Sequence, residues 1–193
     1  VVPYDLATPL FTDYASKHRF VYMPDGQAAK YAAEQMFEYP VGTILVKTFG
    51  YLNDIRDESQ GEELIETRLL IRDRRGWTAW TYVYDEATQD AKLTEDGARR
   101  EMSWTHYDGN ERSINYIVPS AKDCRSCHND QYNVIPIGPK AWNLNRDFNY
   151  DHGTENQLAH WTRIGFLKGV PASETAPALP VWNDSTSGAI AKR

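Results

Sequence analysis

Residues 64–84 read LIETRLLIRDRRGWTAWTYVY, and this stretch decides the fold class. Apolar and polar side chains alternate through 64–71, which is typical of a strand with one buried face. Residues 77–84 are rich in aromatic and β-branched side chains, which also favour a strand. The polar turn at 73–76 ends in glycine and joins the two halves. The stretch therefore predicts an antiparallel β-hairpin.

Further strand patterns lie on both sides of this hairpin, at 43–49, 91–93, 100–107 and 113–118. We expect an α+β, β-rich fold with an antiparallel sheet of five to six strands. Residues 1–25 contain Pro3, Pro9 and Pro24, which oppose long regular elements there. Helices are expected at 27–37, near 120–128, where Ser120 is the expected cap, and at 154–168, which starts with a capping box at 154–157. The C-terminal third is thus predicted to be helical and loop-rich.

Composition sets limits on the class of protein. A chain of 193 residues with 41% hydrophobic residues is long enough for one domain with its own core. The 21 basic residues against 27 acidic ones give a formal charge of −6, which argues against nucleic-acid binding. No apolar run approaches the roughly 20 residues of a transmembrane helix, so we expect no transmembrane segment.

The chemistry is concentrated in Cys124-Arg125-Ser126-Cys127-His128, a Cys-x-x-Cys-His motif. This spacing is the attachment signature of c-type haem, because two thiols on one helical turn can each add to a haem vinyl group. The histidine that follows is then placed to bind the iron from the proximal side. The sequence therefore predicts one haem c, bound by Cys124 and Cys127, with His128 as the proximal ligand.

Other interpretations of the motif remain open. A disulfide across Cys-x-x-Cys would be strained and leaves the histidine unexplained. A thioredoxin-like redox pair needs a βαβ setting, which the strand pattern does not offer. A zinc site needs four ligands, and with only two cysteines in the chain it would have to recruit His106, His152 or His160.

The distal side of the iron is less well defined by sequence. Electron-transfer haems usually carry a distal Met or His, whereas gas-binding or catalytic haems leave that position open. Met102 is the candidate we single out, because strand alternation places it on the same face as Trp104, although core packing explains it as well. The other candidates are Met23, Met36, His18, His106, His152 and His160.

The stretch from Tyr4 to Pro171 resembles the haem domain of a family of bacterial diheme c-type cytochromes of uncertain role. In that family a second Cys-x-x-Cys-His follows on the C-terminal side. The resemblance implies a c-type haem domain at 1–172 and a linker or tail at 173–193 that leads to a second haem domain absent here. Its most specific segments are Cys124–His128 and Ile135–Ala141, supported by Thr8–Tyr14, Tyr39–Phe49, Glu66–Leu70, Val118–Pro119 and Asn156–Leu158.

A weaker resemblance links the pattern Pro-x-Gly-Thr-x-x-x-Lys at 40–47, followed by aromatic strands and a late Cys-x-x-Cys-His, to β-sheet haem proteins. These include hydroxylamine-oxidising cytochromes and the sheet form of cytochrome c-prime. Such proteins keep an open or weakly blocked distal site, and some cross-link a lysine to the haem. Lys47 stands roughly where such a lysine falls, although a solvent-facing lysine in a strand fits the same pattern.

These observations predict a periplasmic or otherwise exported domain that transfers single electrons through its haem. Its partner would be a redox protein or an adjacent haem domain. The alternative is an open-site haem enzyme or sensor that acts on hydroxylamine, nitric oxide or peroxide. No acid–base pair is recognisable beside the motif, so we expect an electron carrier more than a complete enzyme, and no catalytic residue is assigned.

Overall fold

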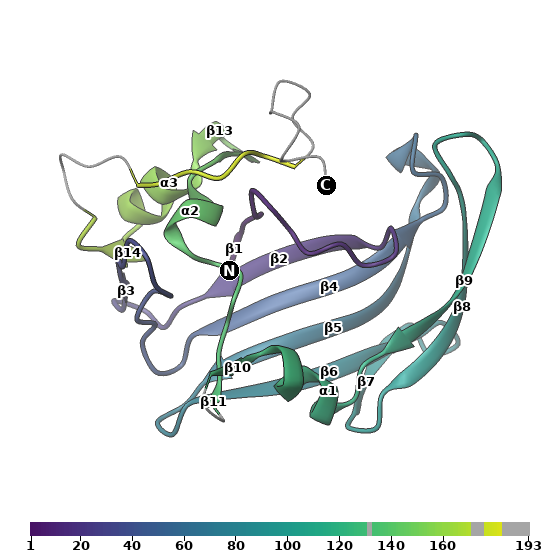
Figure 1. Cartoon of the computed structure of the whole chain (residues 1–193), viewed down its shortest axis with the longest axis horizontal. Coiled ribbons are helices and arrows are strands. Elements are labelled where there is room, and N and C mark those ends of the chain that lie inside the picture. The colour runs from purple at the N-terminus through teal and green to yellow at the C-terminus, as the bar shows by residue number, and fades with distance from the viewer. Residues whose placement is uncertain (131–132, 171–175, 183–193) are drawn as a thin grey trace.

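The computed structural model describes residues 1–130, 133–170 and 176–182. Its main element is a six-stranded antiparallel sheet in the order β1-β2-β4-β5-β6-β7 (Figure 1). The α+β, β-rich class and the predicted sheet are confirmed. The strands are β1 (Val2–Pro3), β2 (Ser16–Tyr22), β4 (Ile44–Leu52), β5 (Glu62–Arg72), β6 (Trp77–Asp85) and β7 (Asp90–Thr94).

A separate hairpin of β8 (Ala98–Thr105) and β9 (Glu111–Val118) follows β7 and continues the curve of the structure in Figure 1. It contacts β4 and packs a second, smaller core against the main sheet. A short 3-10 helix, η1 (Glu58–Gln60), lies in the loop between β4 and β5. The buried residues of the second core are Ala15, Phe49, Tyr51, Ile65, Met102, Trp104, Tyr116 and Val118.

In its described part, the C-terminal third combines three short helices with short strand pairs. The helices are α1 (Ala121–Cys127), α2 (Ala141–Leu144) and α3 (Gln157–Arg163). With 11% helix in all, the prediction of a helical C-terminal third was wrong. The short strands are β10 (Asn129–Asp130), β11 (Asn133–Val134), β12 (Asp147–Tyr150), β13 (Gly153–Asn156) and β14 (Leu167–Lys168), which pairs with β3 (Ala29–Lys30).

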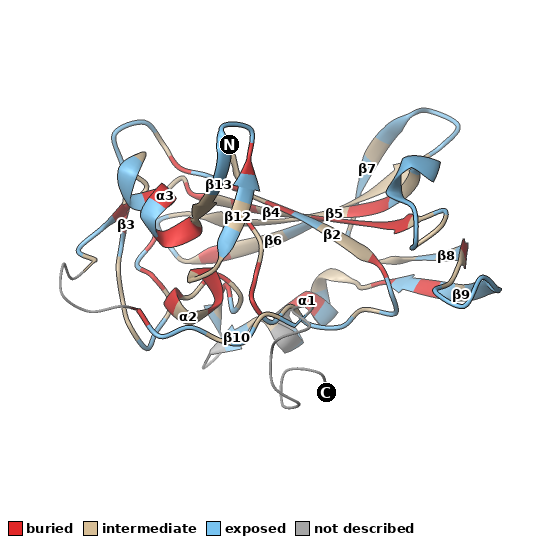
Figure 2. Cartoon of the chain, turned by 90° about the horizontal axis from the view of Figure 1, so that it is seen from above, coloured by how far each residue is buried: buried red, intermediate tan, exposed pale blue. Residues whose placement is uncertain are grey.

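The main core lies where the C-terminal elements pack on the sheet. Figure 2 shows α1 and α2 on the same side of the sheet, with buried residues along the strands and on the inner sides of α2 and α3. Trp161 of α3 and Phe37 of the segment before β4 are fully buried in this cluster, which also contains Val21 of β2. No helix among the described residues is long and apolar enough to cross a membrane.

The helix predicted at 27–37 is absent, and the prediction was wrong. The backbone N–H groups of Ala29 and Tyr31 donate to Phe166 and Lys168, 2.9 and 2.8 Å away, so this segment pairs with a distant part of the chain. Ala29 itself is fully buried. Tertiary pairing has overridden the helical propensity of an alanine-rich sequence.

Two further expectations need correction. The capping box at 154–157 does not form, because Thr154 belongs to the β12–β13 hairpin and Asn156 caps α3 instead. The helix therefore spans 157–163 and not 154–168. Strand β2 was missed at residues 1–25, because the three prolines flank it and do not interrupt it.

The stretch 176–182 lies against the body of the domain. The N–H of Leu179 donates to the carbonyl of Trp142 at 3.1 Å, and that of Trp182 to the carbonyl of Ala7 at 2.9 Å. The rest of the expected tail at 173–193 lies outside the described residues. This part of the expected linker is thus a strap held by backbone hydrogen bonds.

Candidate functional site

Helix α1 carries the Cys-x-x-Cys-His motif and is fixed at both ends. Ser120 and Asp123 form a reciprocal capping box at its start, as expected for Ser120. The helix packs against β6, where the Sγ of Cys124 lies 3.9 Å from the Oγ1 of Thr81. Cys124 is buried at 9% exposure and is a free thiol. The backbone of Cys127 ends the helix, and its side chain lies outside the described part of the chain.

His128 caps α1 at its C-terminal end and is held by the next segment. Its Nδ1 lies 2.8 Å from the carbonyl oxygen of Ile135. Because a carbonyl only accepts, Nδ1 carries the proton and Nε2 keeps its lone pair. Burial, together with the charges of Lys47 and Arg68, lowers the pKa of His128 and so favours the neutral imidazole. This is the form in which histidine binds a metal, oriented through its second nitrogen.

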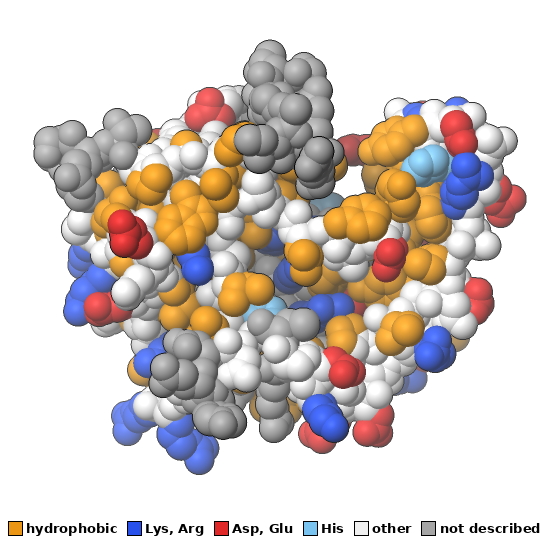
Figure 3. Space-filling view, viewed as in Figure 1, with side chains coloured by type: hydrophobic (Ala, Val, Ile, Leu, Met, Phe, Trp, Pro, Cys, Tyr) orange, Lys and Arg blue, Asp and Glu red, His pale blue; other side chains and the backbone are white. Residues whose placement is uncertain are grey.

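Cys124 and His128 line the same cavity, of about 480 Å³, which has the size of a typical cofactor or ligand site. In Figure 3 a hollow opens in the middle of this face, with basic side chains and a histidine deep inside and hydrophobic side chains around them. The walls are the concave face of the sheet, α1 and the segment that follows β11. The apolar lining includes Leu6, Leu45, Phe49, Leu70, Pro136, Ile137 and Pro139.

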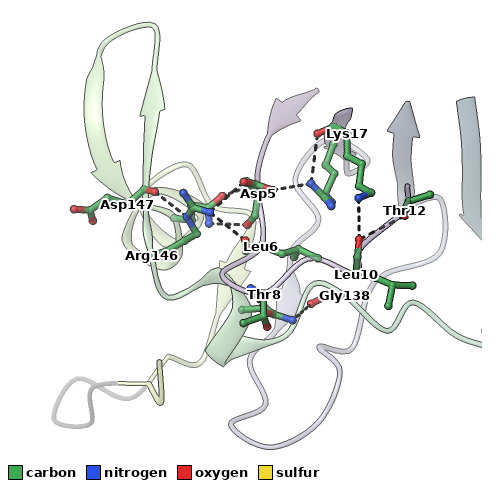
Figure 4. A network of polar contacts seen from close by, with 12 residues as sticks. Asp5, Leu6, Thr8, Leu10, Thr12, Lys17, Gly138, Arg146 and Asp147 are labelled. Carbon is green, nitrogen blue, oxygen red and sulfur yellow. Dashed lines mark hydrogen bonds and ion pairs between the residues drawn. The ribbon is translucent and has the colours of Figure 1, made fainter. Parts of the chain in front are cut away.

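The N-terminal segment forms a further wall of the cavity, through Leu6, Thr8 and residues 10–13. Figure 4 shows how polar contacts hold it in place. The carboxylate of Asp5 forms ion pairs with two arginines. The Nη1 atom of Arg19 lies 2.6 Å from one of its oxygens, and Nη1 of Arg146 lies 3.1 Å from the other. Lys17 donates to the carbonyl of Leu10 at 2.8 Å. A segment without regular structure is thereby fixed over the sheet.

The sheet wall of the cavity carries three basic residues, Arg19, Lys47 and Arg68. Arg19 is paired with Asp5, and Arg68 with the fully buried Glu66 at 2.5 Å. Lys47 lies in the middle of β4 with its Nζ 4.6 Å from the centre of the Phe49 ring. Burial first, and then the neighbouring arginines, lower the pKa of Lys47 to about 7.

Lys47 therefore lines the cavity and is not the solvent-facing lysine that its strand position also allowed. A cross-link between Lys47 and a haem stays a prediction. The sequence did not reveal that Arg19 and Arg68 lie beside it. The register of β2, β4 and β5 brings these three residues together, and the sequence alone does not show that β2 pairs with β4.

Met102, the distal candidate, lies elsewhere. It is 3% exposed and packs in the second core with Phe49, Trp104 and Tyr116, so the structure does not bring it to the cavity. The other distal candidates do not line the cavity either. Among the described lining residues, His128 is the only imidazole, and none is a methionine.

A second cluster of ligand-type side chains lies at the start of α3, formed by His152, Glu155 and His160, whose ligand atoms lie within 4.8 Å of one another. Arg163 occupies its centre, with Nη2 2.6 Å from Glu155 Oε2, 3.2 Å from His152 Nε2 and 3.0 Å from His160 Nδ1. The cluster is therefore an ion-pair network already completed by a cation.

The zinc alternative for the motif is not assembled among the described residues. His152 and His160 belong to the network at α3, and His106 makes an edge-to-face contact with Tyr14, with ring centres 4.7 Å apart. None of these three histidines lines the cavity with Cys124 and His128.

Comparisons with protein-family models, with curated proteins and with solved structures find no match for this chain. The site is therefore interpreted from its own geometry and chemistry.

Proposed function

We propose that this chain is a c-type cytochrome domain with one haem c attached to Cys124 and Cys127, with His128 as the proximal iron ligand. When bound, the haem supplies a one-electron Fe(III)/Fe(II) couple. The function we propose is single-electron transfer to a redox partner or to an adjacent haem domain. An exported, periplasmic location goes with it, because the oxidising side of the membrane is where c-type haem is attached.

The observation that carries the proposal is the position of His128. Nδ1 of His128 donates a hydrogen bond to the Ile135 carbonyl, so Nε2 keeps the lone pair that can bind a metal. His128 lines the cavity that Cys124 also lines. A structural disulfide or a redox pair between the cysteines would not explain why the imidazole is held in this orientation. Cys124 is a buried free thiol at the cavity wall, which is where thioether attachment requires it.

The lining of the cavity also fits a large, flat and mostly apolar cofactor. Leucine, proline and phenylalanine side chains form much of its surface and would contact the faces of a bound haem. At its edge Leu10, Phe11 and Ile137 are 75%, 65% and 43% exposed. Such an apolar rim is suited to close approach by a redox partner.

The second candidate is an open-site haem enzyme or sensor for hydroxylamine, nitric oxide or peroxide. The observation in its favour is that no methionine and no second histidine is among the described residues that line the cavity. An electron carrier usually has such a distal ligand. Both candidates share the same haem attachment.

The attachment is tested by producing the chain in a host that matures c-type cytochromes. We expect the denatured protein to keep the mass of one haem, and acid–ketone extraction to leave the haem on the chain. Cys124→Ala should leave one thioether and shift the alkaline pyridine spectrum, whereas His128→Ala should keep the haem and change the spin state of the iron. Met102→Leu is the matched control and should leave the iron spectrum unchanged, since Met102 packs in the second core.

Extractable haem, or bound zinc in its place, would contradict the attachment. The choice between the two candidates then follows from stopped-flow mixing of the ferrous protein with nitric oxide, and of the ferric protein with hydroxylamine or peroxide. Rapid electron exchange with a small cytochrome, together with slow ligation, supports the carrier. Fast ligation with multiple turnovers supports the enzyme or sensor.

A further inference from the structure

Three basic side chains form a row across the cavity face of the sheet. Strand register pairs Arg19 of β2 with Lys47 of β4, and Lys47 with Arg68 of β5. Directly paired residues of antiparallel strands lie on the same face of a sheet, with strands about 4.8 Å apart. Lys47 is therefore the middle member of the row, with an arginine on each side, and all three line the cavity.

The three charges are not equally compensated. Arg19 has the Asp5 carboxylate at 2.6 Å, and Arg68 has Glu66 at 2.5 Å from Nη2 and 2.7 Å from Nε. The amine of Lys47 has no ion pair or hydrogen bond with any residue that the structure describes, and it makes a cation–π contact with Phe49. The guanidinium of Arg68 lies over the same ring at 4.3 Å.

A charged amine in a largely apolar cavity is unfavourable unless an anion pairs with it, and without one it releases its proton more easily, as the lowered pKa of Lys47 shows. Asp5 and Glu66 pair with the two neighbouring arginines, and no described carboxylate forms an ion pair with Lys47, so an anion from outside the chain would stabilise the charged form of this amine. Lys47 and Arg68 line the same cavity as His128, and their charges lower the pKa of its imidazole, so both lie near enough to act on a group bound there.

We propose that Lys47, with Arg68 beside it, forms an anion-binding site that receives a small inorganic anion as a ligand of the haem iron. The inference rests on the haem attachment proposed above and is independent of whether the domain is a carrier or an enzyme. The anion is small because it shares a cavity of about 480 Å³ with the cofactor. Azide and nitrite are suitable probes, since both are anions that bind ferric haem.

The experiment compares the haem-loaded wild type with Lys47→Met, Lys47→Arg and the control Lys30→Met, whose amine is 75% exposed and paired with Glu38. Each ferric protein is titrated with sodium azide and sodium nitrite at constant ionic strength. Carbon monoxide binding to the ferrous form provides a neutral ligand. Lys47→Met should raise the Kd of both anions by about tenfold to a hundredfold, as expected for loss of a charge-assisted hydrogen bond. Carbon monoxide affinity should not change, and Lys47→Arg and Lys30→Met should bind the anions like the wild type.

Three results would overturn the site while leaving the haem attachment intact. Equal anion affinities of Lys47→Met and the wild type would show that Lys47 does not contact the ligand. Conversion of the ligand-free ferric protein from low spin to high spin in Lys47→Met would show that the amine itself binds the iron. Loss of affinity for carbon monoxide and the anions alike would indicate a structural effect or pairing with the haem carboxylates. A chain that carries no covalent haem would instead overturn both proposals.

Discussion

The ion pair of Glu66 and Arg68 lies in the sheet wall of the cavity, and its removal is a direct test of how that wall is held. Glu66 has no exposed surface and accepts hydrogen bonds from Arg68 Nη2 at 2.5 Å, Arg68 Nε at 2.7 Å and the Tyr116 hydroxyl at 2.7 Å. Tyr116 comes from β9, so the carboxylate also ties the second hairpin to the main sheet. We expect Glu66→Leu to leave the partly buried guanidinium of Arg68, 26% exposed, and the buried hydroxyl of Tyr116 without their acceptor.

Breaking a buried pair by removing one partner costs about 3–5 kcal/mol. For a chain of this length each kcal/mol lowers Tm by about 2–4 °C, so Glu66→Leu should lower Tm by about 6–20 °C. The matched control is Glu38→Leu, which removes the Lys30 pair, whose two side chains are 75% and 72% exposed. That change should cost at most about 1 kcal/mol.

A double-mutant cycle separates the pair from simple loss of packing. Glu66→Leu combined with Arg68→Met replaces both charges with apolar groups of similar length. The double variant should be more stable than Glu66→Leu alone, because no uncompensated charge is then buried. Tm is measured by calorimetry or circular dichroism on all four proteins. A Glu66→Leu protein that melts within about 2 °C of the wild type, or a double variant no more stable than the single one, would refute the reasoning.

Two further predictions concern stability. The pKa of Lys47 in the folded protein is about 7, below its ordinary value of 10.5. Between these pH values the unfolded chain therefore binds more protons than the folded one. The wild type consequently gains stability as the pH rises through that range. Relative to the wild type, Lys47→Met should therefore have its highest free energy of unfolding at pH 6 and lose that advantage by pH 10, as measured by urea unfolding. A stability difference that does not change with pH would contradict the lowered pKa of Lys47. Gly97 has φ +76°, and a Cβ there would meet the Val118 carbonyl oxygen, so Gly97→Ala should cost clearly more than the about 1–2 kcal/mol expected from left-handed backbone alone. Gly26→Ala, at φ +70° with nothing within 4 Å, is the control, and equal losses would show that the close approach is relieved at no cost.

Much of the sheet could be predicted because its signals are local. The hairpin at 64–84 appears as β5 and β6, and the shorter patterns downstream appear as β7, β8 and β9. Helix α1 was also predictable, since Ser120 and Asp123 form a cap within four residues of sequence. In each case the periodicity or cap that forms the element is contained within the element itself.

The errors arise where distant parts of the chain decide the structure. Residues 27–37 have the composition of a helix, yet their backbone pairs with β14, which lies more than a hundred residues further on. Met102 was correctly placed on a strand, but the face it shares with Trp104 turns towards the second core. Alternation along a strand shows which residues lie on the same face of the sheet. It does not show which of the two cores that face packs against.

The candidate site divides in the same way. Its attachment half is contiguous in sequence, because Cys124, Cys127 and His128 lie on or next to one helical turn. Its opposite half is assembled by register from β2, β4 and β5, and each of its basic residues looks like an ordinary surface charge when read alone. The motif therefore predicts the cofactor but carries no information about the wall that the cofactor would face.

That wall, and not the motif, separates the two proposed functions. If the proposed haem is bound, no methionine or second histidine among the described lining residues is available as its second ligand, and Lys47 and Arg68 are the charged residues we propose to act on that position. If the amine of Lys47 does not itself bind the iron, its positive charge would favour anionic ligands. The same charge would also stabilise the reduced, less positive state of the iron, so that the iron would lose an electron less easily. The same lysine would thus raise the reduction potential of a carrier and select the ligands of an enzyme. Measuring the potential and the anion affinity of Lys47→Met side by side therefore shows which of these effects the wall exerts.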